Sequence, residues 1–599
     1  MSSPVISFSE QQAGSSRHTG VDPITVEIIR HALTAIPAQI DSNIVRTAYS
    51  PLIYEYKDYA VGIVDHEGNL LSQSQGALPI FVANALGVAV RDGLSIYGAT
   101  GFRDGDLVFS NHSGTLGQHL NNVVMYAPIF VGEHKSHLFG FMAVISHWMD
   151  VGGLVPGSIS PFATEIFQEG VQYRSLKLAE SGVRNPGVYK TIECNTRFPR
   201  EVLGDMEAQA AGCVRGAELV AKVIEKYGLR TSREAIDEIW EKSEQASRAA
   251  IRAIPDGVYS ADSFLDDDGL DLETPIAIGV DVHVSGDTLT VDFSRTHDEV
   301  RGAINSGREG GALAAARIAF KYLIEPHEPA NEGAFRPLKV VIPDGKFISA
   351  SANAAMGSYS GPLPTVVDTI LKALAPVSRG KVTAGHHGTF GAHIFTGRRP
   401  ETGERYQHID TAVGGWGATS TKDGVGPYKS LCHGDTLDVP VEVQEALYPL
   451  MLEEVSFRVD SGGAGKTRGG VGVKKRYRVL SGCVVTVMQD RKRCPPWGVG
   501  GGLPGAYPTT LHERDGSVSE IRKAELTLVP GDMMETRSGG GGGCGNPFER
   551  SPELVSRDVQ DGFVSVQVAR TIYGVVLRED CSVDVEATAA ARRNTHPPQ

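Results

Sequence analysis

Two loops in the first quarter of the chain carry residue types that bind metal ions or act as acids and bases. "ISHWMDVGG" places His147 and Asp150 three residues apart, and "SNHSGTLGQHLNN" carries His112 and His119. Zn²⁺ and Mn²⁺ take imidazole and carboxylate ligands from loops that meet in space, and Asp58 in "YKDYA" could join from an earlier strand. These residues either form one metal site or are unconnected loop side chains, which is the commoner outcome for a spaced motif without context.

Two further groups of polar residues have a functional and a structural interpretation. His386, His387, His393 and His408 form a second histidine group, for which polar loop histidines are the favoured interpretation. The stretch "SPFATEIFQEG" predicts a short helix with two glutamates, 165 and 169, one turn apart on one face. Such a pair could supply general bases, but more often it caps a helix start or binds backbone amides.

Three glycine-rich motifs do not meet the requirements of the chemistry they suggest. In "GGAGKTRGG", Asp460 stands where a phosphate-binding loop needs glycine, and a strand pattern follows where a helix is needed. In "GSYSG" the centre is Tyr359, where a nucleophile elbow needs serine. The run "GGGGG" at 539–543 lacks a following basic residue and a strand-to-helix context, and it predicts a mobile loop.

The candidate residues lie at the ends of predicted strands. "DLVFSN", "NVVMYAPIFV" and "LFGFMAVIS" read as buried strands, with His119 and His147 near their ends. Loops at strand ends are where a rigid scaffold usually carries chemistry. Helices are predicted around these strands. One begins at Asp22-Pro23 with apolar residues Ile24, Ile28 and Ile36, and Pro37 should kink or end it.

The sequence predicts a mixed α/β (α+β), multidomain, glycine-rich fold with mixed sheets and flanking helices. A disordered tail at 1–20 precedes an N-terminal α/β domain at 21–255, which carries the candidate site. A long helix in this domain, from "PREVLGD" onward, should end at Gly228. A central α/β domain at 256–380 and a β-rich C-terminal domain at 381–599, ending in two short helices, complete the chain.

Composition excludes several classes of protein. With 71 acidic and 57 basic residues the net charge is −14, which argues against nucleic-acid binding. The apolar runs are too short to span a membrane, and the N-terminus lacks the basic head and apolar stretch of a signal peptide. Seven scattered cysteines without a CxxC pair indicate a reducing compartment. We therefore expect a cytoplasmic protein.

Several longer stretches, taken together and in this order, resemble the hydantoinase B/5-oxoprolinase family. They include "DPITVEIIRHAL", "RTAYSPLIYEYKDYAVGIVDHEGNLLSQ", "DVGGLVPGSISPFATEIFQEG", "REVLGDMEAQAAG", "DSGGAGKTRGGVGV" and "GGGGGCGNPFERSPELVSRDVQDG". The resemblance runs from about Asp22 to Leu577, nearly the whole chain.

The resemblance implies an ATP-dependent complex. A partner subunit of the hydantoinase A type would bind ATP and Mg²⁺ and phosphorylate a carbonyl oxygen, and the present subunit would receive the activated compound. That division fits the missing phosphate loop. Complexes of this family can also hold a second hydantoinase B-type subunit. The family pattern further implies a divalent ion, Zn²⁺ or Mn²⁺, held by Asp58, His119, Asn122 and His147, with His112 as an extra ligand, and catalysis by His119, His147 and Asp150.

The chain departs from the family pattern at two of these motifs. In "GQHLNN" the closing aspartate of the family has become Asn122, and in "HWMDVGG" the second histidine has become Trp148. An amide oxygen is a weaker ligand than a carboxylate and does not offset the charge of a dication. The site either keeps a looser metal, with His112 compensating, or uses His119, His147 and Asn122 as hydrogen-bond donors to a developing oxyanion.

Three functions remain open at this stage. The preferred one is a subunit of a biotin-independent ketone carboxylase, nearest to the acetophenone type, because the altered ligand set favours it. The second is a subunit of an ATP-dependent amidohydrolase that opens hydantoins, 5-oxoproline or lactams. The third is a non-catalytic structural subunit of such a complex.

Overall fold

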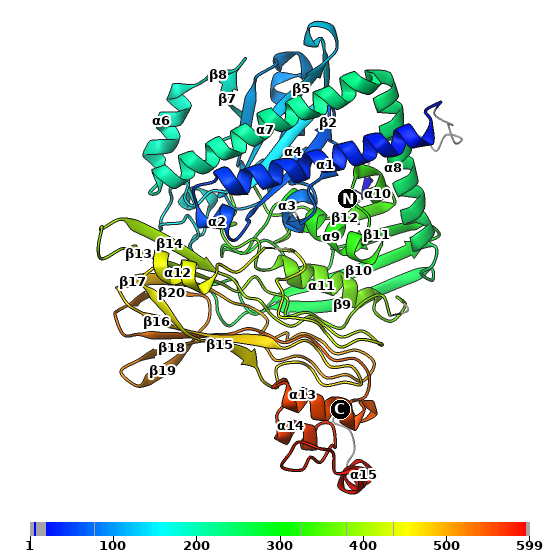
Figure 1. Ribbon diagram of the computed structural model, residues 1–599, viewed down its shortest axis with the longest axis vertical. Coiled ribbons are helices and arrows are strands. Elements are labelled where there is room, and N and C mark those ends of the chain that lie inside the picture. The colour runs from blue at the N-terminus through cyan, green and yellow to red at the C-terminus, as the bar shows by residue number, and fades with distance from the viewer. Residues whose placement is uncertain are drawn as a thin grey trace. The chain divides into compact units, whose positions relative to one another are not determined.

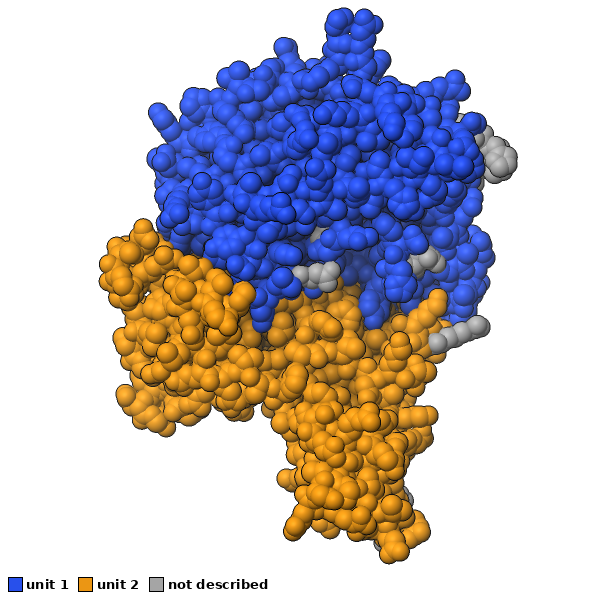
Figure 2. Space-filling view, viewed as in Figure 1, with its two compact units in different colours: residues 1–260, 279–360, 432–439 blue, residues 261–278, 361–431, 440–599 orange. Residues whose placement is uncertain are grey.

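The computed structural model describes residues 5–7, 20–76, 78–324, 326–378, 380–434 and 436–594 of the chain. They form two compact units: unit 1 comprises 1–260, 279–360 and 432–439, and unit 2 comprises the remaining residues (Figure 2). The chain thus crosses between the units several times, where the sequence suggested consecutive domains. Most of the expected N-terminal tail, 1–4 and 8–19, lies outside the described residues. The predicted mixed α/β, multidomain architecture is confirmed, because several separate sheets occur with helices around them (Figure 1).

Unit 1 is built around a seven-stranded antiparallel sheet of order β3-β2-β6-β5-β4-β7-β8. Its strands are β2 (Tyr59–Asp65), β3 (Leu70–Gln73), β4 (Leu107–Ser110), β5 (Asn122–Val131), β6 (His137–His147), β7 (Leu176–Glu180) and β8 (Val183–Arg184). The central strands β5 and β6 are buried along nearly their whole length. They therefore read as continuous apolar runs in the sequence.

Helices cover both faces of this sheet. A Cβ at Gly216 of α7 (Pro199–Tyr227) would press on Met142 of β6, and a Cβ at Gly93 of α4 (Ala85–Tyr97) would overlap Tyr126 of β5. Tyr126 pairs with Ala143, the neighbour of Met142. Because side chains alternate along a strand, α7 and α4 lie on opposite faces of the sheet. Helix α7 ends at the predicted residue, since Gly228 follows it as C-cap.

Helix α1 (Pro23–Thr47) begins as predicted but differs in two respects. Asp22 caps it by accepting a hydrogen bond from Thr25 N at 3.1 Å. The helix continues through Pro37, which is buried, so of the predicted kink or end at this proline the end does not occur. The predicted apolar face is wrong at Ile24 and Ile28, which are exposed, whereas Ile36 is buried as predicted. The buried face consists of Val26, Ile29, Leu33, Ile36, Pro37, Ile40 and Ile44. This long stripe contacts α7 and stabilises the helix on both sides of the proline.

A second sheet has the order β1-β12-β11-β10-β9. Its strands are β1 (Val5–Ser7), β9 (Gly257–Leu265), β10 (Ile276–Ser285), β11 (Thr288–Asp292) and β12 (Leu338–Val341). The other helices of unit 1 are α2 (Pro51–Tyr54), α3 (Pro79–Val82), α5 (Ser113–Leu116), α6 (Pro186–Asn195), α8 (Leu229–Ile251), α9 (Ala314–Leu323) and α10 (Glu332–Phe335). The stretch Pro79–Tyr97 is long and apolar enough to cross a membrane, but 67% of its most apolar window is buried within the protein.

Unit 2 contains two sheets, of orders β14-β13-β17-β20 and β15-β16-β21-β18-β19. Their strands are β13 (Ala392–Arg398), β14 (Arg405–Asp410), β15 (Leu450–Arg458), β16 (Gly472–Val479), β17 (Cys483–Met488), β18 (Thr509–Arg514), β19 (Ser517–Ile521), β20 (Ala524–Leu528) and β21 (Met533–Arg537). The helices are α11 (Leu363–Leu374), α12 (Val441–Leu447), α13 (Pro552–Gln560), α14 (Val566–Thr571) and α15 (Val585–Asn594). The described chain therefore ends in three helices, one more than predicted.

The glycine run 539–543 is a buried structural element of unit 2, so the predicted mobile loop is wrong. Gly541 N donates to Gly470 O at 2.9 Å, and Gly542 N donates to Gly385 O at 2.8 Å. A Cβ on Gly541 would overlap the carbonyl of Trp416. Extended backbones thus approach one another too closely for side chains, and this close approach is what the glycines make possible.

Candidate functional site

Three candidate residues form a row across adjacent strands of the unit 1 sheet. Asn122 at the start of β5 pairs with His147 at the end of β6. His147 N in turn donates to the carbonyl of Asp58, the residue before β2, at 3.0 Å. Residues opposite one another on neighbouring strands point to the same face. The sheet therefore brings Asp58, His147 and Asn122 together at one end of these strands, on the face that α4 covers.

His119 and Tyr359 complete this cluster. His119 Nε2 lies 2.9 Å from Asn122 Oδ1, and the His119 ring meets the His147 ring edge-on, with centroids 4.9 Å apart. Asn122 Nδ2 donates to the hydroxyl of Tyr359 at 2.7 Å and to Gln118 Oε1 at 3.0 Å. The Tyr359 ring packs edge-on against His119 at 4.9 Å. We call Asp58, His119, Asn122, His147 and Tyr359 the row cluster.

Burial sets the charge of the row cluster. It lowers the pKa of His119 to about 4 and the pKa of His147 well below its ordinary value. It raises the pKa of the Tyr359 hydroxyl well above 10, with a further contribution from the charge of Asp58. Both imidazoles and the phenol are therefore neutral near pH 7. His147 Nδ1 is buried and has no hydrogen-bond partner among the described residues.

Trp148 does not belong to the row cluster. It follows His147 at the end of an extended strand, so its side chain points to the opposite face. There its indole Nε1 donates to Gln209 Oε1 of α7 at 3.2 Å, and the ring stacks on Phe109. The tryptophan that replaces the second histidine of the family pattern is thus a core residue, and its presence leaves the row cluster unchanged.

Asp150 is engaged in holding loops together. Its Oδ1 accepts from Gly157 N at 2.9 Å and from Arg197 Nη1 at 2.9 Å, and its Oδ2 accepts from Arg197 N at 2.6 Å. The carboxylate is fully buried. These contacts connect the stretch after β6 to the segment that leads into α7. A role of Asp150 in catalysis stays a prediction, but its contacts are those of a structural residue.

His112 makes its contacts outside the row cluster, and the second histidine group belongs to unit 2. His112 Nδ1 is 2.9 Å from Thr115 Oγ1, and its pKa is lowered by burial and by the charge of Arg174. In unit 2, His393 Nε2 is 2.7 Å from Thr510 Oγ1, and His408 stacks on Phe395. His386 and His387 are buried, and burial lowers the pKa of His386 to about 4 and that of His387 to about 3.

The row cluster does not fit a tightly held divalent ion. Within the part of the chain that the structure describes, no three His, Cys, Asp or Glu side chains converge closely enough to hold one. The donor beside His119 is the neutral amide of Asn122, which offsets none of the charge of a dication. Both ring nitrogens of His119 already have polar neighbours, Asn122 Oδ1 and Gly357 O.

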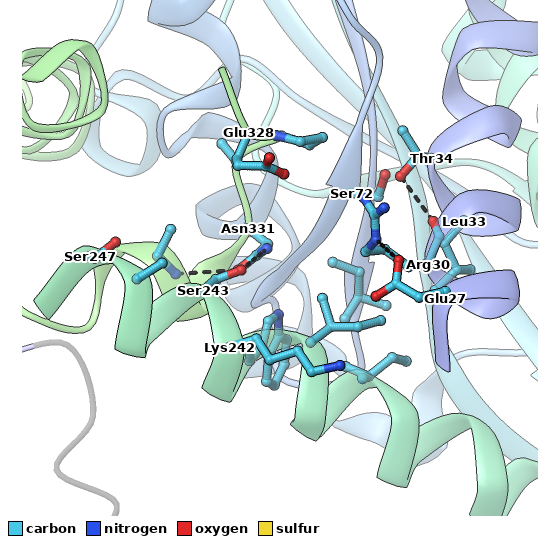
Figure 3. Close-up of a pocket in the computed structure, with 18 of the residues that line it drawn as sticks. Glu27, Arg30, Leu33, Thr34, Ser72, Lys242, Ser243, Ser247, Glu328 and Asn331 are labelled. Atoms are coloured by element: carbon cyan, nitrogen blue, oxygen red, sulfur yellow. Dashed lines mark hydrogen bonds and ion pairs between the residues drawn. The ribbon is translucent and has the colours of Figure 1, made fainter. Parts of the chain in front are cut away.

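A separate cavity of about 360 Å³ lies in unit 1, and none of its lining residues belongs to the row cluster (Figure 3). Its wall combines an apolar part, including Leu33 and Trp240, with charged residues of α1 and α8. Those charges are paired: Arg30 Nε donates to Glu27 at 2.8 Å, and Lys242 pairs with Glu238. These charged residues of α1 and α8 are thus engaged in ion pairs, and we place the site at the row cluster, where the candidate residues at the strand ends converge.

The sequence predicted His119, Asn122, His147 and Asp58 but missed Tyr359. As a motif, "GSYSG" suggests only a serine nucleophile, and Tyr359 is 237 residues from Asn122. The small residues on either side of Tyr359 in this motif allow the backbone to approach a site closely, and they were the feature of the sequence that could have indicated it. Gln118, which contacts Asn122, was also missed although it adjoins His119.

Comparison with known proteins finds one family along most of the chain. The model of the family described as hydantoinase B/oxoprolinase matches residues 22–547. The B subunit of a putative D-/L-hydantoinase of Pseudomonas sp. (strain NS671) is 31% identical, over 96% of this chain and 98% of its own. The crystal structure of an ATP-dependent caprolactamase from Pseudomonas jessenii has 27% identity and a TM-score of 0.88, covering 96% of this chain and 100% of that chain. A nucleotide-free acetone carboxylase structure has 21% identity and a TM-score of 0.87, covering 96% and 83%, a likeness of fold.

Proposed function

Because the chain belongs to the hydantoinase B/oxoprolinase family, we propose that it is the subunit of an ATP-dependent complex that receives a carbonyl compound activated elsewhere in the complex. ATP and Mg²⁺ bind to a hydantoinase A-type partner, and a second hydantoinase B-type subunit joins the assembly. The relatives that support this are themselves named as parts of larger enzymes, the B subunit of a hydantoinase and the beta subunit of a caprolactamase. We propose the cytoplasm as its compartment.

The reaction best supported is the opening of a cyclic amide, such as a hydantoin or a lactam. The hydantoinase and caprolactamase relatives match along nearly the whole chain. The row cluster carries the proposal, because it offers neutral, buried hydrogen-bonding groups at the end of a rigid sheet. Attack on an activated amide places negative charge on oxygen, and preorganised donors in a dry site stabilise that charge strongly.

Each residue of the row cluster has a role in this proposal. The Tyr359 hydroxyl and the Asn122 amide orient the substrate and donate hydrogen bonds to the developing oxyanion, and His119 holds Asn122 in place. His147 is neutral and its Nδ1 has no partner among the described residues, so it accepts the proton of the attacking water. Asp58 is the neighbour of His147 in the row, joined to it by the backbone hydrogen bond from His147 N to Asp58 O, and it holds His147 at the end of β6. No step is assigned to a metal ion, because the donors do not fit one.

Ketone carboxylation is the second candidate. The substitution Asn122, which removes a carboxylate from the row cluster, favours it. An enolate formed from an activated methyl ketone needs neutral donors around its oxygen, and the same groups supply them. A non-catalytic subunit is the third candidate, favoured if alanine at His119 and at His147 leaves turnover intact.

The test uses the complex assembled with its ATP-hydrolysing partner. We expect ATP-dependent release of the ring-opened product from a hydantoin, 5-oxoproline or a lactam without bicarbonate. If labelled bicarbonate enters a product formed from a methyl ketone, and no cyclic amide is opened, the second candidate replaces the first. Loss of turnover in His147→Ala, with the complex still assembled, would exclude a non-catalytic role.

A further inference from the structure

Glu169 is a buried glutamate that the proposed mechanism does not use. It follows a short 3-10 turn (Ile166–Gln168) in place of the helix that the sequence predicted for it and Glu165. Its Oε1 accepts two hydrogen bonds, from Met356 N and Gly357 N, each at 2.7 Å. Its Oε2 has no partner among the described residues. A single carboxyl oxygen thus clamps two consecutive backbone amides of a distant loop.

That loop enters the row cluster at two points. The carbonyl of Gly357 lies 3.2 Å from Nδ1 of His119, and Tyr359, two residues on, contacts Asn122. Gly357 itself approaches Glu169 so closely that a Cβ there would lie 3.3 Å from Oε1. The clamp therefore determines where the Gly357 carbonyl stands relative to the His119 ring.

A backbone carbonyl can only accept a hydrogen bond, whereas an amide side chain and a hydroxyl can each either donate or accept one. A neutral imidazole has one N–H. The Gly357 carbonyl thus selects Nδ1 as the nitrogen that carries the proton of His119. Nε2 then keeps its lone pair and accepts from Asn122, whose amide oxygen and nitrogen exchange places relative to the assignment given above. In the free chain the Tyr359 hydroxyl then donates to the Asn122 oxygen, and the Gln118 amide turns as well, giving up its 3.4 Å hydrogen bond to Ile80 O.

We propose that Glu169 is a positioning residue, which through Gly357 holds His119 in the Nδ1–H form and leaves Nε2 as the lone-pair nitrogen of the site. This deepens the proposed function and rests on it for the catalytic consequence. The tautomer of His119, in contrast, can be measured in the free chain, without the partner subunit. Glu169 acts on the row cluster through the backbone amides of Met356 and Gly357, so its effect is indirect.

The experiment reads the tautomer directly. Long-range ¹H–¹⁵N correlation spectra of the ¹⁵N-histidine-labelled full chain, with the His119 signal identified by its loss in His119→Asn, should show Nδ1–H in the native protein. Glu169→Gln keeps an oxygen for both amides and should retain that form. Glu169→Ala should give a mixture of tautomers or the Nε2–H form. An Nε2–H form in the native chain overturns the proposal without any variant.

Turnover of the complex supplies the second readout. Glu169→Ala should lower kcat on the order of ten- to hundredfold with little change in KM, as is usual when an outer partner of a site residue is lost, and Glu169→Gln should restore most of it. The exposed Glu165 is the matched control, and Glu165→Ala should leave both readouts unchanged. If Glu169→Ala changes neither tautomer nor kcat, the proposal is wrong. If the native complex opens no cyclic amide and carboxylates no ketone, the proposed function fails while the tautomer result still stands.

Discussion

Asn122 and His147 face each other across the β5–β6 pair, at the point where both strands enter loops. Their side chains share one face, and the backbone N–H of His147 also donates to the carbonyl of Asp58, the residue before β2. In this row the two ends are an amide and a carboxylate. The central imidazole therefore has a neutral neighbour on one side and a charged residue on the other, which distinguishes the site from a symmetric metal cage.

Replacing Tyr359 by phenylalanine tests the role of its hydroxyl. The substitution removes the group 2.7 Å from Asn122 Nδ2 and leaves the ring packing intact. We expect kcat of the complex to fall on the order of a hundredfold, the usual cost of one oxyanion donor, with the melting temperature nearly unchanged. Tyr428→Phe, at an exposed tyrosine, is the control. Equal activity in the two variants would remove Tyr359 from the mechanism.

Metal content tests the interpretation of Asn122. We expect the purified complex, measured by elemental analysis of this chain after separation from its partner, to hold Zn²⁺ or Mn²⁺ well below one ion per chain. Asn122→Asp supplies the missing carboxylate next to His119 and should raise the affinity for Zn²⁺ in calorimetric titration. A stoichiometric ion in the native chain, with activity lost on chelation, would show that the amide suffices as a ligand.

Asp150→Asn tests whether that carboxylate is structural. The buried Asp150 pairs with the Arg197 guanidinium at 2.9 Å. Breaking a buried pair leaves one charge without compensation and costs about 3 kcal/mol or more. Arg197 is partly exposed, which reduces that cost. We expect a clear drop in the melting temperature of the free chain, while kcat per folded complex changes less than in Tyr359→Phe. A large loss of kcat at unchanged stability would instead return Asp150 to the catalytic set.

Gly541→Ala tests the glycine packing of unit 2. The added methyl group would overlap the backbone carbonyl of Trp416, which cannot move as a side chain would. We expect destabilisation of about 3 kcal/mol or more, or failure to fold, measured by denaturant unfolding. Gly482→Ala is the control from the same unit, because its Cβ would have one neighbour at an ordinary 3.6 Å. Similar stability of both variants would contradict the close packing.

Buried histidines predict loss of stability in mild acid. Burial lowers the pKa of His119, His386 and His393 to about 4 and that of His387 to about 3. Below the ordinary pKa of about 6.5 the unfolded chain binds protons that the folded chain does not. The free energy of unfolding should therefore be unaffected by these groups above pH 6.5 and should fall as the pH drops from 6.5 toward 4.

A variant pair checks this assignment. His387→Gln removes one such group, so its unfolding free energy should depend less steeply on pH in that range. His134→Gln, at an exposed histidine, should follow the native curve. Identical slopes for all three proteins would show that other groups cause the acid sensitivity.

Glu169 changes the pH dependence of stability in the opposite direction. Burial raises its pKa to about 8, so the stability linked to its proton is lost as the pH rises from about 4.5 through 8.

Much of the local structure follows from local signals. Asp22 caps α1 through its own side chain, and Gly228 ends α7, so both boundaries were predictable from neighbouring residues. The strands that carry Asn122 and His147 were predictable from their apolar runs. Pro37 within α1 was not, because the buried stripe against α7 that keeps the helix intact depends on residues far along the chain. For the same reason the five glycines looked like a loop, although other backbones pack against them.

By itself the sequence determined the residue types of the site and the strand ends on which His119, Asn122 and His147 lie, because those depend on short-range patterns of polarity and turn residues. The tertiary structure decided which of them meet. Strand register placed Asp58, His147 and Asn122 in one row and turned Trp148 to the other face. A loop more than two hundred residues away then brought Tyr359 and Gly357 to His119. This contact forms only in the folded chain, because the two segments are far apart in the sequence.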